Sequence, residues 1–165
     1  MNRNLVFRYR VSLGIFIVGL VISGLSAFPL LSGLSLIVDF LGNPDPADFA
    51  AERTLPNWFA LAHDGLSQTH ARYPFLLYGY DWLAFGHLVI AMFFVGPFVR
   101  PESNRWVLHA GLAACAGVIL VALICGTIRS IPWFWQLIDC SFGILGAIPL
   151  LYCVRLSRKL DSVEL

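Results

Sequence analysis

Four stretches of the chain are apolar along nearly their whole length, and polar turn residues separate them. They occupy residues 11–28, 82–99, 106–125 and 135–154. A bilayer core about 30 Å thick is crossed by roughly 20 residues of helix, and every backbone amide must bond within its own segment. The pattern therefore predicts an all-α fold, an integral membrane four-helix bundle that forms a single membrane domain over residues 1–165.

The first apolar stretch continues past Phe28 to Leu41, which is too long for one straight span. Pro29 lies inside it. A proline removes one helical hydrogen bond and clashes with the preceding turn, so we expect the helix to kink or end there. Residues 30–41 then form a tilted or interfacial extension of the first helix.

The arginines that precede this stretch are also a feature of secretory signal peptides. In that interpretation Ala27 is the cleavage point. The apolar run is longer than a usual signal core and continues beyond Ala27, which favours a membrane span.

One long segment, Gly42 to Asp81, separates the first two spans. It opens on Asn43-Pro44-Asp45-Pro46, which is a turn signal, and residues 55–70 are predicted to form a short amphipathic helix on the membrane surface. We therefore expect a partly helical outer loop over 42–81.

Composition agrees with membrane insertion, since 58% of the 165 residues are hydrophobic and 13% are charged. Soluble domains carry roughly a quarter charged residues. The basic residues are not clustered with aromatic residues on one face, so no nucleic-acid partner is expected. The expected surroundings are the lipid bilayer, with other membrane subunits or further copies of the chain as partners.

Basic residues accumulate on the cytoplasmic side of short membrane loops. Eight of the eleven lie on one side of the predicted spans, and these are Arg3, Arg8, Arg10, Arg100, Arg105, Arg155, Arg158 and Lys159. Both termini are therefore predicted to be cytoplasmic (N-in/C-in), and the bacterial cytoplasmic membrane is the predicted location.

Ionisable groups inside a membrane are costly and mark functional sites. His87, Asp139, Arg129 and Asp81 all belong to the outer half of the predicted bundle. An imidazole and a carboxylate at one depth can bind a ligand or relay protons, whereas the alternative is that Asp139 accepts hydrogen bonds that only fix helix packing.

His109 lies near the inner end of its span, roughly 15 Å in depth from His87. Two imidazoles on one iron need nitrogens about 4 Å apart, so a haem held by this pair is disfavoured. No cofactor is assigned.

His63 and His70 are metal-ligand candidates in the outer loop. Seven residues place both rings on one helix face but about 10 Å apart, so one metal requires a break in the helix, for which Gly65 is a candidate. The alternative is a solvated helix surface.

The four cysteines lie in or beside apolar runs without metal-site spacing, and they are interpreted as small buried residues. A disulfide between Cys125 and Cys140 is a further hypothesis. Small residues recur every fourth position at Gly19, Ser23 and Ala27 and again at Gly143 and Ala147, which suits close helix contact inside the bundle or with a partner.

Three functions are compatible with these features. The first is a non-catalytic subunit or partner of a larger membrane complex. The second is a membrane enzyme, or a cofactor-binding or metal-binding protein, with an outward-facing site around His87 and Asp139. The third is an oligomeric transporter or proton-conducting unit. The sequence favours the first and leaves catalysis undecided.

Overall fold

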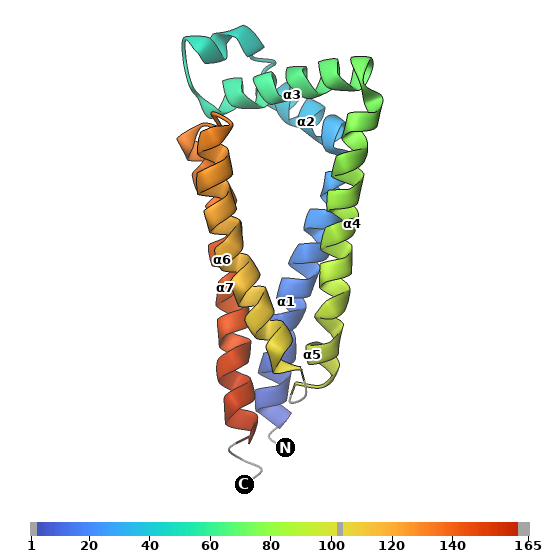
Figure 1. Ribbon diagram of the computed structural model, residues 1–165, viewed down its shortest axis with the longest axis vertical. Coiled ribbons are helices and arrows are strands. Elements are labelled where there is room, and N and C mark those ends of the chain that lie inside the picture. The colour runs from blue at the N-terminus through green and yellow to red at the C-terminus, as the bar shows by residue number, and fades with distance from the viewer. Residues whose placement is uncertain (1–2, 102–103, 162–165) are drawn as a thin grey trace. The chain divides into compact units, whose positions relative to one another are not determined.

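The computed structural model describes residues 3–101 and 104–161, and all regular structure in these ranges is helical (Figure 1). The prediction of an all-α fold is confirmed for these residues. The elements in chain order are α1 (Arg3–Ala27), α2 (Leu30–Phe40), η1 (Pro46–Ala50), α3 (Leu55–Arg72), η2 (Pro74–Leu77), α4 (Tyr78–Phe93), α5 (Val95–Val99), α6 (Arg105–Ile128) and α7 (Trp133–Asp161).

Four helical segments of the described chain are long and apolar enough to cross a membrane, as is typical of a multi-pass membrane protein. They are Arg3–Ala27, Pro74–Val99, Arg105–Ile128 and Trp133–Leu160. The first two begin eight residues before the predicted starts at 11 and 82. A helix can extend beyond the apolar core that crosses a membrane, so the predicted span starts at 11 and 82 stay predictions.

The chain divides into two compact units. Unit 1 comprises Met1–Val21 and Val89–Leu165, and unit 2 comprises Ile22–Leu88. The single membrane domain over 1–165 stays a prediction.

Close contact between α6 and α7 organises unit 1, and the two helices run side by side in Figure 1. Glycines allow this approach. A Cβ added at Gly143 would lie 2.5 Å from the Cys115 carbonyl oxygen, and one added at Gly111 would lie 2.9 Å from a methyl group of Leu150. At Gly143 the helices therefore pack backbone against backbone, as small residues permit in membrane proteins. The Gly143 contact joins two helices of the same chain. The small-residue pattern had left open whether such contact occurs inside the bundle or with a partner.

Polar side chains connect the helices of unit 1, and they donate to backbone carbonyls. Ser12 Oγ donates to the Pro149 carbonyl at 3.3 Å, and Arg105 Nη2 donates to the Ser157 carbonyl at 2.9 Å. A helix carbonyl can accept a second hydrogen bond while it keeps its own helical bond. These contacts join α1 to α7 and α6 to α7 without breaking either helix.

Pro29 ends the first helix in unit 2. Helix α1 stops at Ala27, α2 begins at Leu30, and the Gly33 amide donates to the Pro29 carbonyl at 2.8 Å. Just before this break, a Cβ added at Gly24 would lie 2.9 Å from the Ala84 carbonyl oxygen of α4. The end of α1 therefore packs tightly on the start of α4.

The outer segment is largely helical, as predicted. It turns at Gly42 (φ +84°) and Asn43 (φ 52°), and Thr54 caps the first turn of α3 by accepting from the Asn57 amide at 3.5 Å. Helix α3 packs on α2 and runs crosswise to α4 in Figure 1. This geometry fits a helix that lies along a membrane surface.

The contact at Gly143 gives a stability prediction. Gly143→Ala places a methyl group against the Cys115 carbonyl, so α6 and α7 must separate. We expect the free energy of unfolding in detergent to fall by about 1–3 kcal/mol. Gly117→Ala is the matched control, because an added Cβ there meets nothing within 4 Å. Unfolding monitored by circular dichroism checks the difference, and equal effects of the two variants would contradict it.

Candidate functional site

The four predicted intramembrane site residues are divided between the two units. His87 and Asp81 lie on α4 within unit 2, whereas Asp139 on α7 and Arg129 at the end of α6 lie within unit 1. A site that combines His87 with Asp139 therefore stays a prediction.

His87 is half-buried and oriented by its own helix. Its Nδ1 lies 2.8 Å from the Leu83 carbonyl oxygen, and because a carbonyl only accepts, Nδ1 carries the proton. His109 on α6 is held the same way, with Nδ1 2.9 Å from the Arg105 carbonyl oxygen. Both rings are thus fixed with Nε2 as the remaining acceptor.

Asp139 is half-buried on α7, and Arg129 is exposed at the C-terminal end of α6. No hydrogen bond or ion pair joins Asp139 to Arg129 or to any other residue in the described ranges. Arg129 instead contributes its backbone amide, which donates to the Cys125 carbonyl at 3.0 Å.

The proposed break at Gly65 between His63 and His70 does not occur. Helix α3 is continuous from Leu55 to Arg72, and His63 Nε2 lies 3.5 Å from the Ser67 hydroxyl. Helical geometry therefore keeps the two imidazoles about 10 Å apart along the axis. Across residues 3–101 and 104–161 there is no group of three or more His, Cys, Asp and Glu side chains that could hold a metal ion.

All four cysteines carry free thiols. Cys125 is exposed, whereas Cys115, Cys140 and Cys153 are buried. The disulfide hypothesis for Cys125 and Cys140 is therefore wrong for this structure. Cys153 Sγ instead contacts the Tyr9 carbonyl oxygen at 3.6 Å. Burial agrees with the sequence interpretation for Cys115, Cys140 and Cys153, whereas that interpretation is wrong for Cys125.

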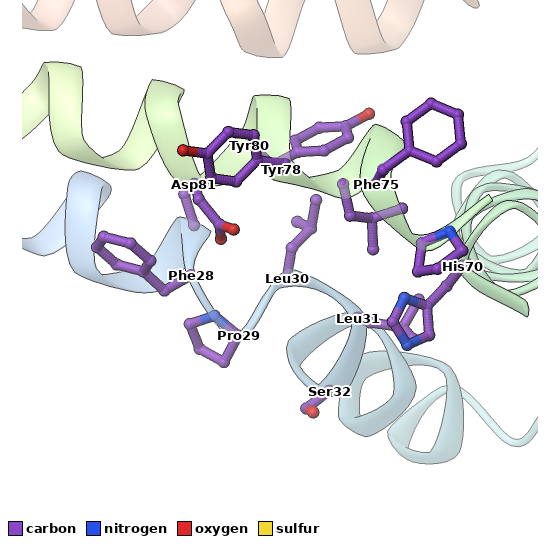
Figure 2. Close-up of a pocket in the computed structure, with 13 residues that line it drawn as sticks. Phe28, Pro29, Leu30, Leu31, Ser32, His70, Phe75, Tyr78, Tyr80 and Asp81 are labelled. Atoms are coloured by element: carbon purple, nitrogen blue, oxygen red, sulfur yellow. The ribbon is translucent and has the colours of Figure 1, made fainter.

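A pocket of about 520 Å³ in unit 2 contains two of the predicted site residues, His70 and Asp81 (Figure 2). The end of α1, the start of α2, the end of α3 and the segment that leads into α4 form its walls. Its lining consists of Ala27, Phe28, Pro29, Leu30, Leu31, Ser32, His70, Pro74, Phe75, Leu77, Tyr78, Tyr80 and Asp81. Figure 2 shows His70 and Asp81 at separate ends of the pocket, with Leu30 between them.

The aromatic lining of this pocket was missed by the sequence analysis. Phe28 comes from the helix break, whereas Phe75, Tyr78 and Tyr80 shortly precede the candidate Asp81 in the sequence. The signal was the density of aromatic residues from 73 to 82. The sequence does not show which of these rings share a pocket, and the contribution of Phe28 required the fold.

Comparison with known proteins finds no match, since no family model, no curated protein and no solved structure is similar to this chain. The argument for a function therefore comes from the geometry of these residues.

The continuous α3 helix gives a prediction for the metal hypothesis. A single metal cannot bridge His63 and His70 across two helical turns, so wild-type protein should bind Zn²⁺ no more tightly than the His63→Ala/His70→Ala double variant. Calorimetric Zn²⁺ titration of both proteins checks this. A stoichiometric site that the double variant loses would contradict it.

Proposed function

We propose that this chain is a four-span protein of a bacterial cytoplasmic membrane, with both termini in the cytoplasm, that acts as a non-catalytic subunit or partner of a larger membrane complex. Other membrane subunits or further copies of the chain are its proposed partners.

Charge distribution supports this orientation. Unit 1, which contains both termini and the turn before α6, has nine basic and four acidic residues. Unit 2, which contains the outer segment, has two basic and six acidic residues. Short basic segments remain in the cytoplasm during membrane insertion, so this distribution favours an outer segment outside the cytoplasm.

The observation that carries the subunit proposal is the use of polar groups inside the helices. Five side-chain hydrogen bonds between elements of unit 1 end on a backbone carbonyl: Ser12 on Pro149, Arg105 on Ser157, Cys153 on Tyr9, and Arg10 on Phe98 and Val99. In addition, the Arg8 guanidinium lies over the Tyr152 ring, 5.6 Å from its centroid. Such contacts fix helix packing. This is the arrangement expected of a structural component.

Surface positions in the spans favour contact with other membrane helices. An added Cβ would meet nothing within 4 Å at Gly19 in α1, Gly86 in α4 or Gly117 in α6. Lipid chains do not require glycine, whereas helix pairs in membranes approach closely at small residues. These positions are open to a partner helix, unlike Gly143 and Gly111.

One observation favours the alternative of an enzyme or cofactor-binding protein. The Nδ1 bond of His87 to the Leu83 carbonyl fixes the tautomer and directs Nε2 away from its own backbone, as is common for catalytic and metal-binding histidines. A role for His87 with Asp139 is the second candidate function.

The orientation gives a labelling prediction. In a Cys125→Ser background, which removes the exposed native thiol, Glu52→Cys lies in the outer segment and Asn104→Cys lies at the start of α6. A membrane-impermeant maleimide should label Glu52→Cys in intact cells and Asn104→Cys only after permeabilisation. The reverse pattern would show that the termini are outside.

The two candidate functions differ in a complementation test. If the chain is a structural subunit, His87→Ala and Asp139→Asn should restore a deletion strain as well as the wild type does, and tagged protein extracted in mild detergent should retain a stoichiometric partner. Growth of the strains and native mass spectrometry of the extracts are the measurements.

Failure of His87→Ala to complement, at wild-type levels of folded protein, would favour the enzyme. A Gly143→Ala control shows the effect of lost packing alone, so the two causes can be separated.

A further inference from the structure

Asp81 projects into the pocket of unit 2 among aromatic side chains. The residue lies in the first turn of α4, and Phe28, Phe75, Tyr78 and Tyr80 line the same pocket. In Figure 2 the Asp81 carboxylate points from α4 toward the turn at Phe28 and Pro29, beside Tyr80. A cation near such rings is attracted by their π-electron faces, and a carboxylate adds an opposite charge.

The carboxylate of Asp81 is available to a ligand. Asp81 is exposed, and the described residues provide it with no recorded hydrogen bond or ion pair. Unit 2 as a whole carries six carboxylates and two arginines, a formal charge of −4. The local potential therefore favours a cation. The helix dipole alone explains an acidic residue in the first turn, but it does not explain the aromatic lining.

The size and lining of the pocket select an organic cation over a metal ion. The volume of about 520 Å³ lies within the range of about 300–1,000 Å³ found for small-molecule sites. A bare Ca²⁺ ion would need about six to eight oxygen ligands, whereas Asp81 is the only carboxylate in the lining. At the other end of the pocket, the His70 imidazole can bond a polar group of the same ligand.

We propose that this pocket binds the ammonium group of an organic amine, with Asp81 as the counter-ion and the Phe28 and Tyr80 rings against its apolar surface. Two sources supply this chemistry, an amine-bearing phospholipid headgroup and a free small amine. The lipid source rests on the proposed membrane placement, in which the exposed rings of Tyr78 and Phe75 lie at headgroup level. The ammonium chemistry does not depend on that placement.

Native mass spectrometry of the full-length protein in mild detergent tests the lipid source, with phosphatidylethanolamine and phosphatidylglycerol as competing probes. The wild type should retain phosphatidylethanolamine over phosphatidylglycerol by about tenfold, and Asp81→Asn should abolish this preference. Asp64→Asn is the matched control. It removes the same charge from unit 2 at a position outside the pocket, where Asp64 accepts from Gln68 at 2.7 Å.

Calorimetric titration with ethanolamine tests the free amine, with sodium chloride of equal ionic strength as the blank. Binding should be lost in Asp81→Asn and kept in Asp64→Asn. A second pair tests the rings independently of the charge, because Tyr80→Phe keeps the aromatic face and Tyr80→Leu removes it. Tyr80→Phe should bind as the wild type does, and Tyr80→Leu should bind several-fold more weakly. Circular dichroism and a monodisperse elution profile establish that each variant is folded.

The outcomes separate the two sources. Ethanolamine binding without a lipid preference assigns a soluble amine, and a lipid preference without ethanolamine binding assigns the headgroup; both support the ammonium site. Equal losses of lipid preference or of ethanolamine binding in Asp81→Asn and Asp64→Asn would overturn the proposal. Equal retention of both lipids by the wild type, together with no ethanolamine binding, would also overturn it. If Asp81→Asn does not fold, the Tyr80 pair decides. The labelling and complementation tests do not involve Asp81 or Tyr80, so failure here leaves the proposed function standing.

Discussion

Hydrogen bonding of the backbone in an apolar medium is the constraint on which the rest of this structure depends. Lipid offers no donors or acceptors, so each apolar segment must satisfy its amides internally, and a helix does so. The same requirement limits the partners of polar side chains. Within unit 1 they donate to helix carbonyls, as Ser12 does to Pro149 and Arg105 does to Ser157. The backbone that forms the helices thus also provides the acceptors that connect them.

Glycine allows neighbouring helices to approach each other closely. Where α6 meets α7, Gly143 lets the Cys115 carbonyl approach to a distance that any side chain would prevent. Close approach then brings the dispersion contacts that replace the hydrophobic effect as a stabilising force between helices in lipid. Similar contact occurs within unit 2, where Gly24 lies against the Ala84 carbonyl. Both close contacts place a glycine against the carbonyl of a neighbouring helix.

The sequence was sufficient to predict the helices, the break at Pro29 and helix α3, because each depends on local properties. A proline cannot donate in the helical ladder, and an apolar run of sufficient length has one favourable structure in lipid. Helix starts were less predictable, since α1 and the span that begins at Pro74 extend beyond their apolar cores. Gly65 was a poor guide to a helix break, because the turns on both sides of it bond normally and Thr69 also donates to its carbonyl at 2.7 Å.

The candidate site was less predictable than the helices, because it depends on which distant residues meet. Depth along a helix predicts Asp81 in the outer half of the bundle, but depth does not specify neighbours. The turn at Pro29 brings Phe28 to the same pocket as Asp81, which is more than 50 residues away in the sequence. The two units therefore use their polar residues differently. In unit 1 Ser12, Arg10 and Arg105 donate to backbone carbonyls, whereas in unit 2 a carboxylate and an imidazole line a pocket. If the chain has ligand-binding chemistry of its own, the helix break at Pro29 is the feature that creates it.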